Sequence, residues 1–337
     1  MLMQSTRRGL AVLALTVLAA GPALAHDGHH HDPETGEIVV DVQAPVPETA
    51  GQAPESKVTM EVRDGVRYFT ANGIANHKTG DFPNRGNPNT IREQNYSYQM
   101  PAAPRMAERS RSATGQAFGI ALNGVVYDPG TAEFWNNNRD WNYEALSGKI
   151  NLGVDSSNAH VQPTGAYHYH GLPVGLLKVL KAKSSSMTLV GYAADGFPMY
   201  AVYGHKDARD PRSPMVKLKS SWRVRAGKRP DGGPSGRYDG TYTADYEYVE
   251  NLGDLDECNG RFGVTPEYPD GTYYYVLTAD FPYIPRYFRG TPDPSFSRRG
   301  PGGGGPGGGG PGGQGGQQGG PGGQGGPGGN RPPPPRR

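Results

Sequence analysis

Cysteine is almost absent from this chain, because Cys258 is the only one among 337 residues. A single cysteine cannot form a disulfide within one molecule, so the fold must rest on its core, its polar network and any bound ion. No histidine lies near Cys258 in the sequence. We therefore expect a small buried side chain there rather than a nucleophile.

A strong excess of one charge is also missing. The formal net charge is +2, and the basic residues form no stripe of the kind that binds nucleic acid. We therefore predict no nucleic-acid partner.

Long apolar runs are absent after the first residues. Residues 10–20 form an apolar segment, which is shorter than the roughly 20 residues that a spanning helix needs. Arg7 and Arg8 precede it and Ala23-Leu24-Ala25 follows it, as in a secretory signal peptide. We predict a signal peptide at residues 1–25, no integral membrane span, and export to the periplasm or the extracellular space. The arginine pair also fits a twin-arginine signal, although plain secretory export is the simpler interpretation.

Histidines open the segment that would follow cleavage. His26, His29, His30 and His31 lie among aspartates, a composition typical of divalent metal capture. The alternative is a solvated tail with incidental affinity for metals. Residues 26–56 are predicted to form this His-rich tail and a disordered linker.

Low-complexity sequence closes the chain. Residues 300–337 consist mainly of Gly, Pro and Gln, with almost no apolar side chains to offset the entropy of ordering. We predict a disordered tail that could contact the cell envelope.

Residues 57–299 show short strand-like segments between turns rich in Gly, Asn and Pro. Residues 58–62 and 66–71 alternate around Asp64-Gly65, and a second pair of segments flanks Asn123-Gly124, a strong hairpin signal. Residues 174–182 carry leucines at helical spacing. We predict one mainly β domain, either β-sandwich-like or made of two packed β units, with long ordered loops and one or two short helices.

The segment Tyr167-His168-Tyr169-His170 is the most informative one. Alternate residues of a strand share a face, so His168 and His170 would lie on one face, about 7 Å apart along the strand. His160 precedes a Pro-Thr-Gly turn and could fold back as a third ligand. Three imidazoles suit copper or zinc, and spacing does not choose between them. The alternative is that these rings fill a packed, hydrogen-bonded sheet.

This motif lies in an internal repeat, which we place at about residues 151–204 and 251–290. Asn151-Leu152-Gly153 is echoed by Asn251-Leu252-Gly253, and the segment 165–170 by 271–276. In the second copy, Arg261, Tyr274 and Val276 stand where the first has His160, His168 and His170. Shared order of unusual elements indicates a duplicated unit, and its chemistry would belong to the first copy.

Two further residues could join a site. Asp195, in the turn Ala194-Asp195-Gly196, could be an oxygen ligand or could orient an imidazole, although a turn-capping role is the alternative. His77 could be a remote ligand, but a lone loop histidine is more often structural or exposed. The sequence has no Gly-x-Ser-x-Gly, His-Glu-x-x-His or phosphate-loop motif.

The chain resembles the YHYH domain family of secreted proteins. The resemblance covers roughly residues 70–290, and the residues that carry it are Asn72-Gly73-Ile74, Asn76-His77, Asp155, His160, Gly165, residues 167–170, Asp195-Gly196-Phe197-Pro198 and Asp256-Glu257-Cys258-Asn259-Gly260. It implies export and a cation site, but no established reaction. Some relatives have a cysteine before the motif where this chain has Ser157, which argues against a cysteine ligand in the first copy.

Three functions follow from these observations. The first is an exported metal-binding protein in which His160, His168 and His170 hold copper or zinc, with the His-rich tract as a capture tail. The second is a metal-dependent hydrolase or oxidase at the same site, with Asp195 as a candidate base. The third is a surface module whose tyrosine-rich faces contact polysaccharide.

Overall fold

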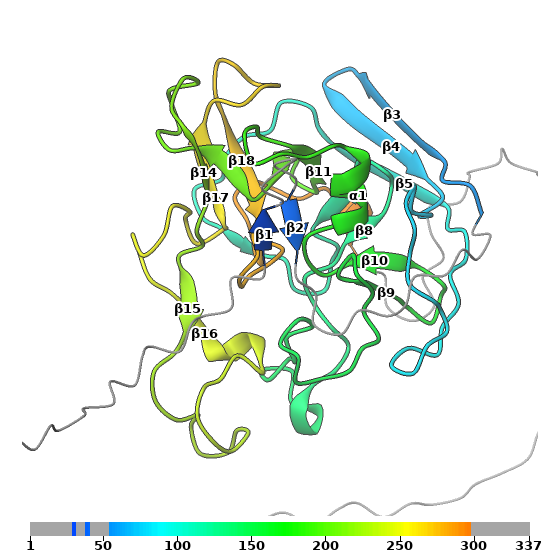
Figure 1. Ribbon diagram of the computed structural model, residues 1–337, viewed down its shortest axis with the longest axis vertical. Coiled ribbons are helices and arrows are strands. Elements are labelled where there is room, and N and C mark those ends of the chain that lie inside the picture. The colour runs from blue at the N-terminus through cyan, green and yellow to red at the C-terminus, as the bar shows by residue number, and fades with distance from the viewer. Residues whose placement is uncertain (1–28, 32–37, 41–53, 298–337) are drawn as a thin grey trace, which may run out of the picture. The chain divides into compact units, whose positions relative to one another are not determined.

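The computed structural model describes residues 29–31, 38–40 and 54–297. The fold is mainly β, as the sequence predicts (Figure 1). One α-helix, α1 (Val174–Val179), and three 3-10 turns at Trp135–Asn137, Thr243–Asp245 and Pro294–Phe296 complete the regular elements of the described residues. No helix in these ranges is long and apolar enough to cross a membrane.

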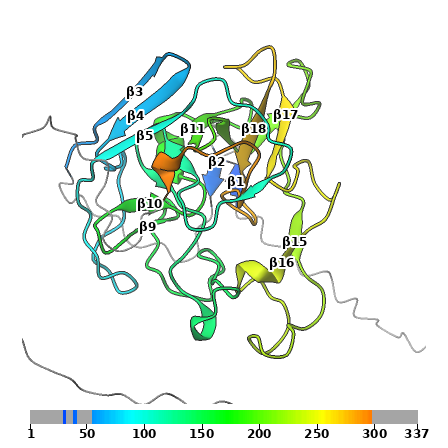
Figure 2. The same cartoon turned by 180° about the vertical axis from the view of Figure 1, so that it is seen from behind.

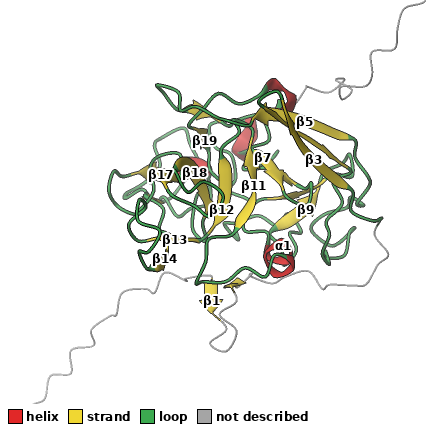
Figure 3. Ribbon diagram, turned by 90° about the horizontal axis from the view of Figure 1, so that it is seen from above, coloured by secondary structure: helices red, strands yellow, loops and turns green. Residues whose placement is uncertain are grey.

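One mixed sheet of eight strands forms the centre of the domain. Its order is β17-β18-β12-β11-β7-β8-β10-β9, so that β9 and β17 lie at opposite edges (Figures 1 and 2). The bounds are β7 (Gly119–Ala121), β8 (Val126–Tyr127), β9 (Ala159–Val161), β10 (Tyr167–Tyr169), β11 (Leu189–Ala193), β12 (Pro198–Ala201), β17 (Gly260–Gly263) and β18 (Thr272–Leu277). The predicted first copy, residues 151–204, is not contiguous in this sheet, because β7 and β8 lie between β10 and β11, whereas β17 and β18 of the predicted second copy lie together at the other edge (Figure 3).

The described residues also form five smaller antiparallel sheets. They pair β3 (Val58–Arg63), β4 (Val66–Ala71) and β5 (Tyr96–Pro101); β6 (Arg111–Ser112) and β19 (Tyr287–Phe288); β13 (Tyr203–His205) and β14 (Met215–Lys217); β15 (Trp222–Val224) and β16 (Tyr246–Tyr248); and β1 (His29–His31) and β2 (Ile38–Val40). The short pair β1–β2 falls inside the segment predicted as a tail and linker.

Local turn chemistry explains the hairpins that the sequence predicts. Gly65 and Gly124 have positive φ angles of 75° and 80°, which glycine adopts without steric cost. The hairpins β3–β4 and β7–β8 turn at these two positions. The predicted helix begins at Val174 and ends earlier than expected, at Val179.

Tyrosine fills much of the interior. Six tyrosines are among the largest fully buried side chains: Tyr127, Tyr167, Tyr169, Tyr200, Tyr274 and Tyr275. A buried phenol needs a hydrogen-bond partner; Tyr167, for example, donates to Asp155 at 2.6 Å. Cys258 is fully buried, as predicted for a small core side chain.

The hairpins at the two edges of the sheet have the same register. In β9–β10, His160 pairs with His168; in β17–β18, Arg261 pairs with Tyr274. The inner strand of each hairpin then pairs in parallel with its neighbour, β8 or β12.

The turns that lead into these hairpins also match. Within its own hairpin, each of Asp155 and Asp256 accepts two backbone N–H bonds and one tyrosine hydroxyl, from Ser157, Ala159 and Tyr167 in the first and from Cys258, Gly260 and Tyr273 in the second. Asn158 and Asn259 both have left-handed φ angles, of 54° and 53°. The two edges are thus built on the same hydrogen-bond plan.

Candidate metal centre

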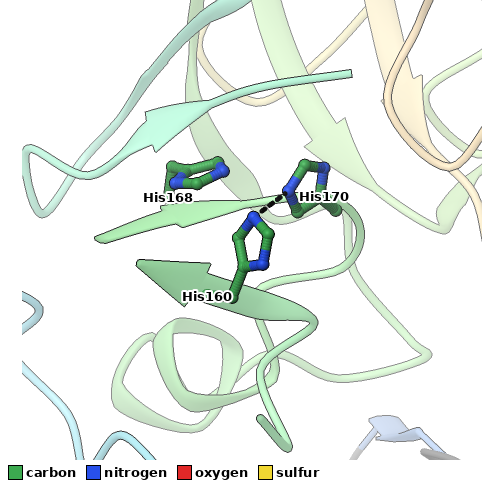
Figure 4. A group of neighbouring side chains, drawn as sticks. All are labelled: His160, His168 and His170. Atoms are coloured by element: carbon green, nitrogen blue, oxygen red, sulfur yellow. Dashed lines mark hydrogen bonds between the residues drawn. The ribbon is translucent and has the colours of Figure 1, made fainter. Parts of the chain in front are cut away.

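The register of the edge hairpin brings three histidines together. His160 on β9 lies opposite His168 on β10, and His170 follows β10 on the same face. The three ring centroids are 4.7 Å apart in each pair. One nitrogen from each ring lies within 4.8 Å of the other two, and the rings point toward one another (Figure 4).

Backbone carbonyls fix which nitrogen faces the centre in two of the rings. His160 Nδ1 lies 2.9 Å from the carbonyl oxygen of Leu152, and His168 Nδ1 lies 3.1 Å from that of Ala166. A carbonyl only accepts, so each Nδ1 carries the proton and donates. In the neutral rings, Nε2 of both histidines is then left with a free lone pair.

His170 completes the triad in a different way. Its Nε2 lies 3.0 Å from His160 Nε2, so one of these nitrogens must carry a proton when nothing else is bound. Because His160 Nε2 is the acceptor, His170 Nε2 is the donor. His170 Nδ1 is buried and has no hydrogen-bond partner, an arrangement that a native interior rarely leaves without a role.

Burial keeps these imidazoles neutral. His168 is 3% exposed and His170 is 2% exposed, while His160 is partly buried. Desolvation, with a smaller contribution from His160, lowers the pKa of His168 to about 3. Desolvation also lowers the pKa of His160, and lowers that of His170 well below its usual value. Three neutral imidazoles present lone pairs rather than charges.

A carboxylate that the sequence analysis missed lies beside the triad. Asp128 Oδ2 is 4.0 Å from His168 Nε2, and both side chains are buried. Gln162 donates to the same oxygen at 3.3 Å, and Gly130 N donates to Oδ1 at 3.1 Å. Asp128 directly follows β8, so the parallel pairing of β8 with β10 brings it to the site.

Asp195 lies elsewhere, and the structure does not bring it to the histidines. It sits in the β11–β12 turn, where its Oδ2 accepts from Tyr275 Oη at 2.5 Å and from Gly290 N at 2.8 Å. Desolvation raises its pKa to about 6, against the lowering effect of Tyr275. The turn-capping alternative describes it better, since Phe197 N also bonds to this carboxyl.

His77, the other histidine candidate whose side chain is described, is likewise separate from the triad. His77 Nε2 bonds to Tyr169 Oη at 2.7 Å, and its Nδ1 bonds to the carbonyl of Lys78. His26 lies outside the described residues, and so do the side chains of His29, His30 and His31, whose backbone forms β1.

Comparison with known families now adds an identity. The family model described as YHYH protein matches residues 97–290, which include the triad, Asp128 and both edge hairpins. The chain belongs to the YHYH protein family. The match begins after Asn72 to His77, which the sequence resemblance had included. Comparison of this YHYH protein with curated proteins and with solved structures gave no match.

Proposed function

We propose that this YHYH protein is an exported metal-binding protein in which His160 and His168, through Nε2, and His170, through a ring nitrogen that has released its proton, hold one copper or zinc ion. The observation that carries the proposal is the pair of carbonyl contacts at Nδ1, which commit the Nε2 atoms of His160 and His168 to the centre. Metal-binding histidines commonly donate their second nitrogen in this way, which fixes the ring and raises its basicity.

The donor set favours copper or zinc over harder cations. Imidazole nitrogens bind these ions at about 2.0–2.1 Å, whereas magnesium and calcium prefer oxygen. The three nitrogens already lie within 4.8 Å of one another, so small ring rotations would bring them to bonding distance. Asp128 stands where it could supply a fourth ligand or accept a hydrogen bond from a metal-bound water.

Burial favours binding over catalysis. His168 and His170 are almost fully enclosed, which leaves a substrate little access, although Asp128 would suit the enzyme alternative as a carboxylate next to the ion. The polysaccharide-binding alternative loses its main support, because six of the tyrosines are fully buried rather than presented on a face.

Metal analysis of the purified protein tests the proposal. We expect one copper or zinc ion per chain after dialysis of a protein lacking residues 26–32, so that the His-rich tract does not contribute. The His168→Ala/His170→Ala double variant should lose this ion. His205→Ala is the matched control. His205 is a partly buried histidine on β13 that bonds to the carbonyl of Ser213, so this variant should retain full metal content. A double variant that keeps its metal would remove the proposal.

Export is part of the proposal and has its own test. The motifs of the chain resemble those of a family of exported proteins, and residues 1–25 have the signal-peptide pattern. Mass spectrometry of the secreted protein should find His26 as the first residue. A chain that retains Met1 in the cytoplasm would contradict export, and loss of export in an Arg7→Lys/Arg8→Lys variant would favour the twin-arginine route.

We further propose that the sheet is an internal duplication of β7-β8-β9-β10 and β11-β12-β17-β18. The strand order supports this. Read inward from its edge, one half runs β9, β10, β8, β7, and the other runs β17, β18, β12, β11, so that each strand has an equivalent in the other half. The central β7–β11 pairing supports it too, since Ile120 pairs with Tyr192 and the flanking pairs are Ala121–Gly191 and Gly119–Ala193. This alignment matches Asp195 with Asn123, and each of these two residues bonds to the equivalent tyrosine, Asp195 to Tyr275 and Asn123 to Tyr169.

A further inference from the structure

The two edge hairpins differ in what covers them. Leu152 and Val161 of the first are 6% and 1% exposed, but their equivalents Leu252 and Phe262 are 48% and 46% exposed. Large apolar side chains are seldom left this bare on two neighbouring segments without a binding role. The same backbone plan is therefore sealed at one edge of the sheet, whereas at the other Leu252 and Phe262 stay exposed beside the bonds that Arg261 and Val264 make to the carbonyls of His205 and Ala208.

A segment of the chain itself seals the first hairpin. Residues 77–89 cross it, and Gly80 N donates to Asp155 Oδ2 at 3.0 Å. The ring of Phe82 contacts that of Tyr167, with centroids 6.1 Å apart.

The same segment continues along the outer strand. The side-chain amides of Asn87 and Asn89 donate to the carbonyl oxygen of Val161, at 2.9 Å and 2.8 Å. The cover therefore makes three kinds of contact: a backbone N–H to a carboxylate, an aromatic ring against a tyrosine, and amide donors to a strand carbonyl.

The second hairpin has a pocket where the first has this cover. The pocket measures about 420 Å³, and Asp256, Tyr273 and Phe262 line it. These three are the equivalents of Asp155, Tyr167 and Val161, the residues that contact the cover. Within the described part of the chain, the hydrogen bonds to Asp256 come from its own hairpin.

We propose that this pocket binds an extended peptide segment of a partner protein, seated as residues 77–89 are seated on the first hairpin. The segment supplies a backbone N–H to Asp256, an aromatic side chain against Tyr273 and Phe262, and a side-chain amide to the strand carbonyl at Phe262. This inference rests on the matching geometry of the two hairpins and not on metal binding by the triad.

The charges in the pocket favour a ligand that donates hydrogen bonds. Two guanidiniums line the wall, but Arg261 already donates to Tyr274 and Arg289 donates to the carbonyl of Ala107. The carboxylates of Glu250 and Asp256 line it as well, and a carboxylate only accepts. Backbone and asparagine N–H groups of a peptide match such acceptors.

The probe for the test is a fluorescently labelled synthetic peptide with the sequence of residues 77–89. Binding to the full chain is measured by anisotropy, and we expect a saturable increase with a dissociation constant in the micromolar range, as for small interfaces. A matched peptide with N-methylglycine in place of Gly80 lacks the N–H group and should bind at least tenfold more weakly, because a hydrogen bond to a carboxylate is lost.

Protein variants locate the binding. Phe262→Ser and Asp256→Asn should each weaken binding of the probe at least tenfold. Val224→Ser is the control, since Val224 is a 39% exposed apolar residue on β15 that does not line the pocket, and it should bind as the wild type does. The His168→Ala/His170→Ala variant should also bind unchanged, which separates this result from the metal proposal. Thermal melts verify that each variant is folded.

Three outcomes overturn the inference. The first is the absence of saturable binding at millimolar protein. The second is binding that Phe262→Ser leaves unchanged while the variant is folded. The third is a dimer in sedimentation analysis that Phe262→Ser converts to monomer without any probe binding, which would assign the face to a second copy of the chain.

Discussion

At the scale of single residues, the enclosure of the triad governs how metal binding responds to acid. Exposed imidazoles with an ordinary pKa of about 6.5 lose roughly tenfold in affinity each when the pH falls one unit below that value. The pKa of His168 is about 3, and those of His160 and His170 are also lowered by burial. We predict that affinity for zinc falls less than about tenfold between pH 7.5 and pH 5.5, measured by chelator competition on protein lacking residues 26–32.

A peptide of residues 26–32 is the reference for that measurement. Its histidines carry ordinary imidazoles, so its affinity should fall steeply over the same range. If the zinc affinity of the protein fell as steeply with pH as that of the peptide, the protein's ion would not be held by buried imidazoles.

The buried carboxyl of Asp195 predicts a pH effect on stability. Its pKa is about 6 in the folded chain against about 3.9 when unfolded. Between these values the folded chain holds a proton that the unfolded chain has released, so the contribution of Asp195 is full below about pH 4 and is lost as the pH rises to 6. The loss amounts to about 3 kcal/mol at most.

Urea denaturation of the wild type and of Asp195→Asn at pH 4, 5, 6 and 7 measures this. The asparagine variant cannot titrate, so the stability of the wild type relative to the variant should fall from pH 4 to 6 and then level off. A difference that grows with pH would mean that the three hydrogen bonds to Asp195 lower its pKa instead.

The sequence predicted the residues of the triad but not their whole surroundings. Strand alternation placed His168 and His170 on one face, and the short turn after His160 suggested its return. Asp128 could not be predicted, because it reaches His168 only through the parallel pairing of β8 with β10, and no local pattern specifies which strands pair across a long connection. For Asp195 the sequence left two roles open, and its contacts with Tyr275, Gly290 and Phe197 fit the turn-capping one.

At the scale of elements, one carboxylate joins the first edge hairpin to its cover. Asp155 accepts from Gly80 N, from Ser157 and Ala159 of its own turn, and from Tyr167 Oη. Asp155→Ala removes the acceptor of four buried donors, and each backbone N–H left unpaired costs about 1–3 kcal/mol before relaxation. We predict a loss of at least about 3 kcal/mol of stability and faster hydrogen exchange over residues 77–89.

Asp256→Ala is the control for that prediction. Asp256 is only partly buried and receives no bond from another segment among the described residues, so the same change should cost less there. Unchanged exchange over residues 77–89 in Asp155→Ala would show that the cover is held by other contacts.

Hairpins with a glycine turn were the elements most readily predicted. Asp64-Gly65 and Asn123-Gly124 need backbone angles that few residues other than glycine adopt, so β3–β4 and β7–β8 follow from local chemistry. Strand β5 and the pair β6–β19 were not predicted, because they are short or unpatterned and are held by partners far along the chain.

At the scale of the whole molecule, a bound ion should raise thermal stability by mass action. Free ligand at 100 times its dissociation constant adds about 2.7 kcal/mol. For a domain of about 250 residues this corresponds to a rise in melting temperature of about 5–10 °C. Calorimetry with and without zinc or copper should show that rise in the wild type.

The His168→Ala/His170→Ala variant should melt at the same temperature with and without metal. A similar rise in that variant would place the stabilising ion elsewhere, for example in the His-rich tract. Treatment of the wild type with a chelator should return the melting temperature to its metal-free value.

The mainly β class followed from composition, while the order of the eight strands did not. Frequent short strands and turns predict β structure wherever they occur. The symmetric order depends on the pairing of β7 with β11 at the centre, where Ile120 pairs with Tyr192, 72 residues further along the chain. The repeat in the sequence suggested two packed units, but it did not predict that their strands would form one sheet.

The triad and the open pocket lie at the two ends of one sheet, and this separation decides how they can influence each other. The inner strands β10 and β18 are five strand-to-strand steps of about 4.8 Å apart and the edge strands seven, which puts the two sites on the order of 20–30 Å apart. Perturbations at such distances usually add independently. Metal occupancy and partner occupancy would then be uncorrelated, and a single chain could hold an ion and a protein at once, as a passive bridge rather than a switch.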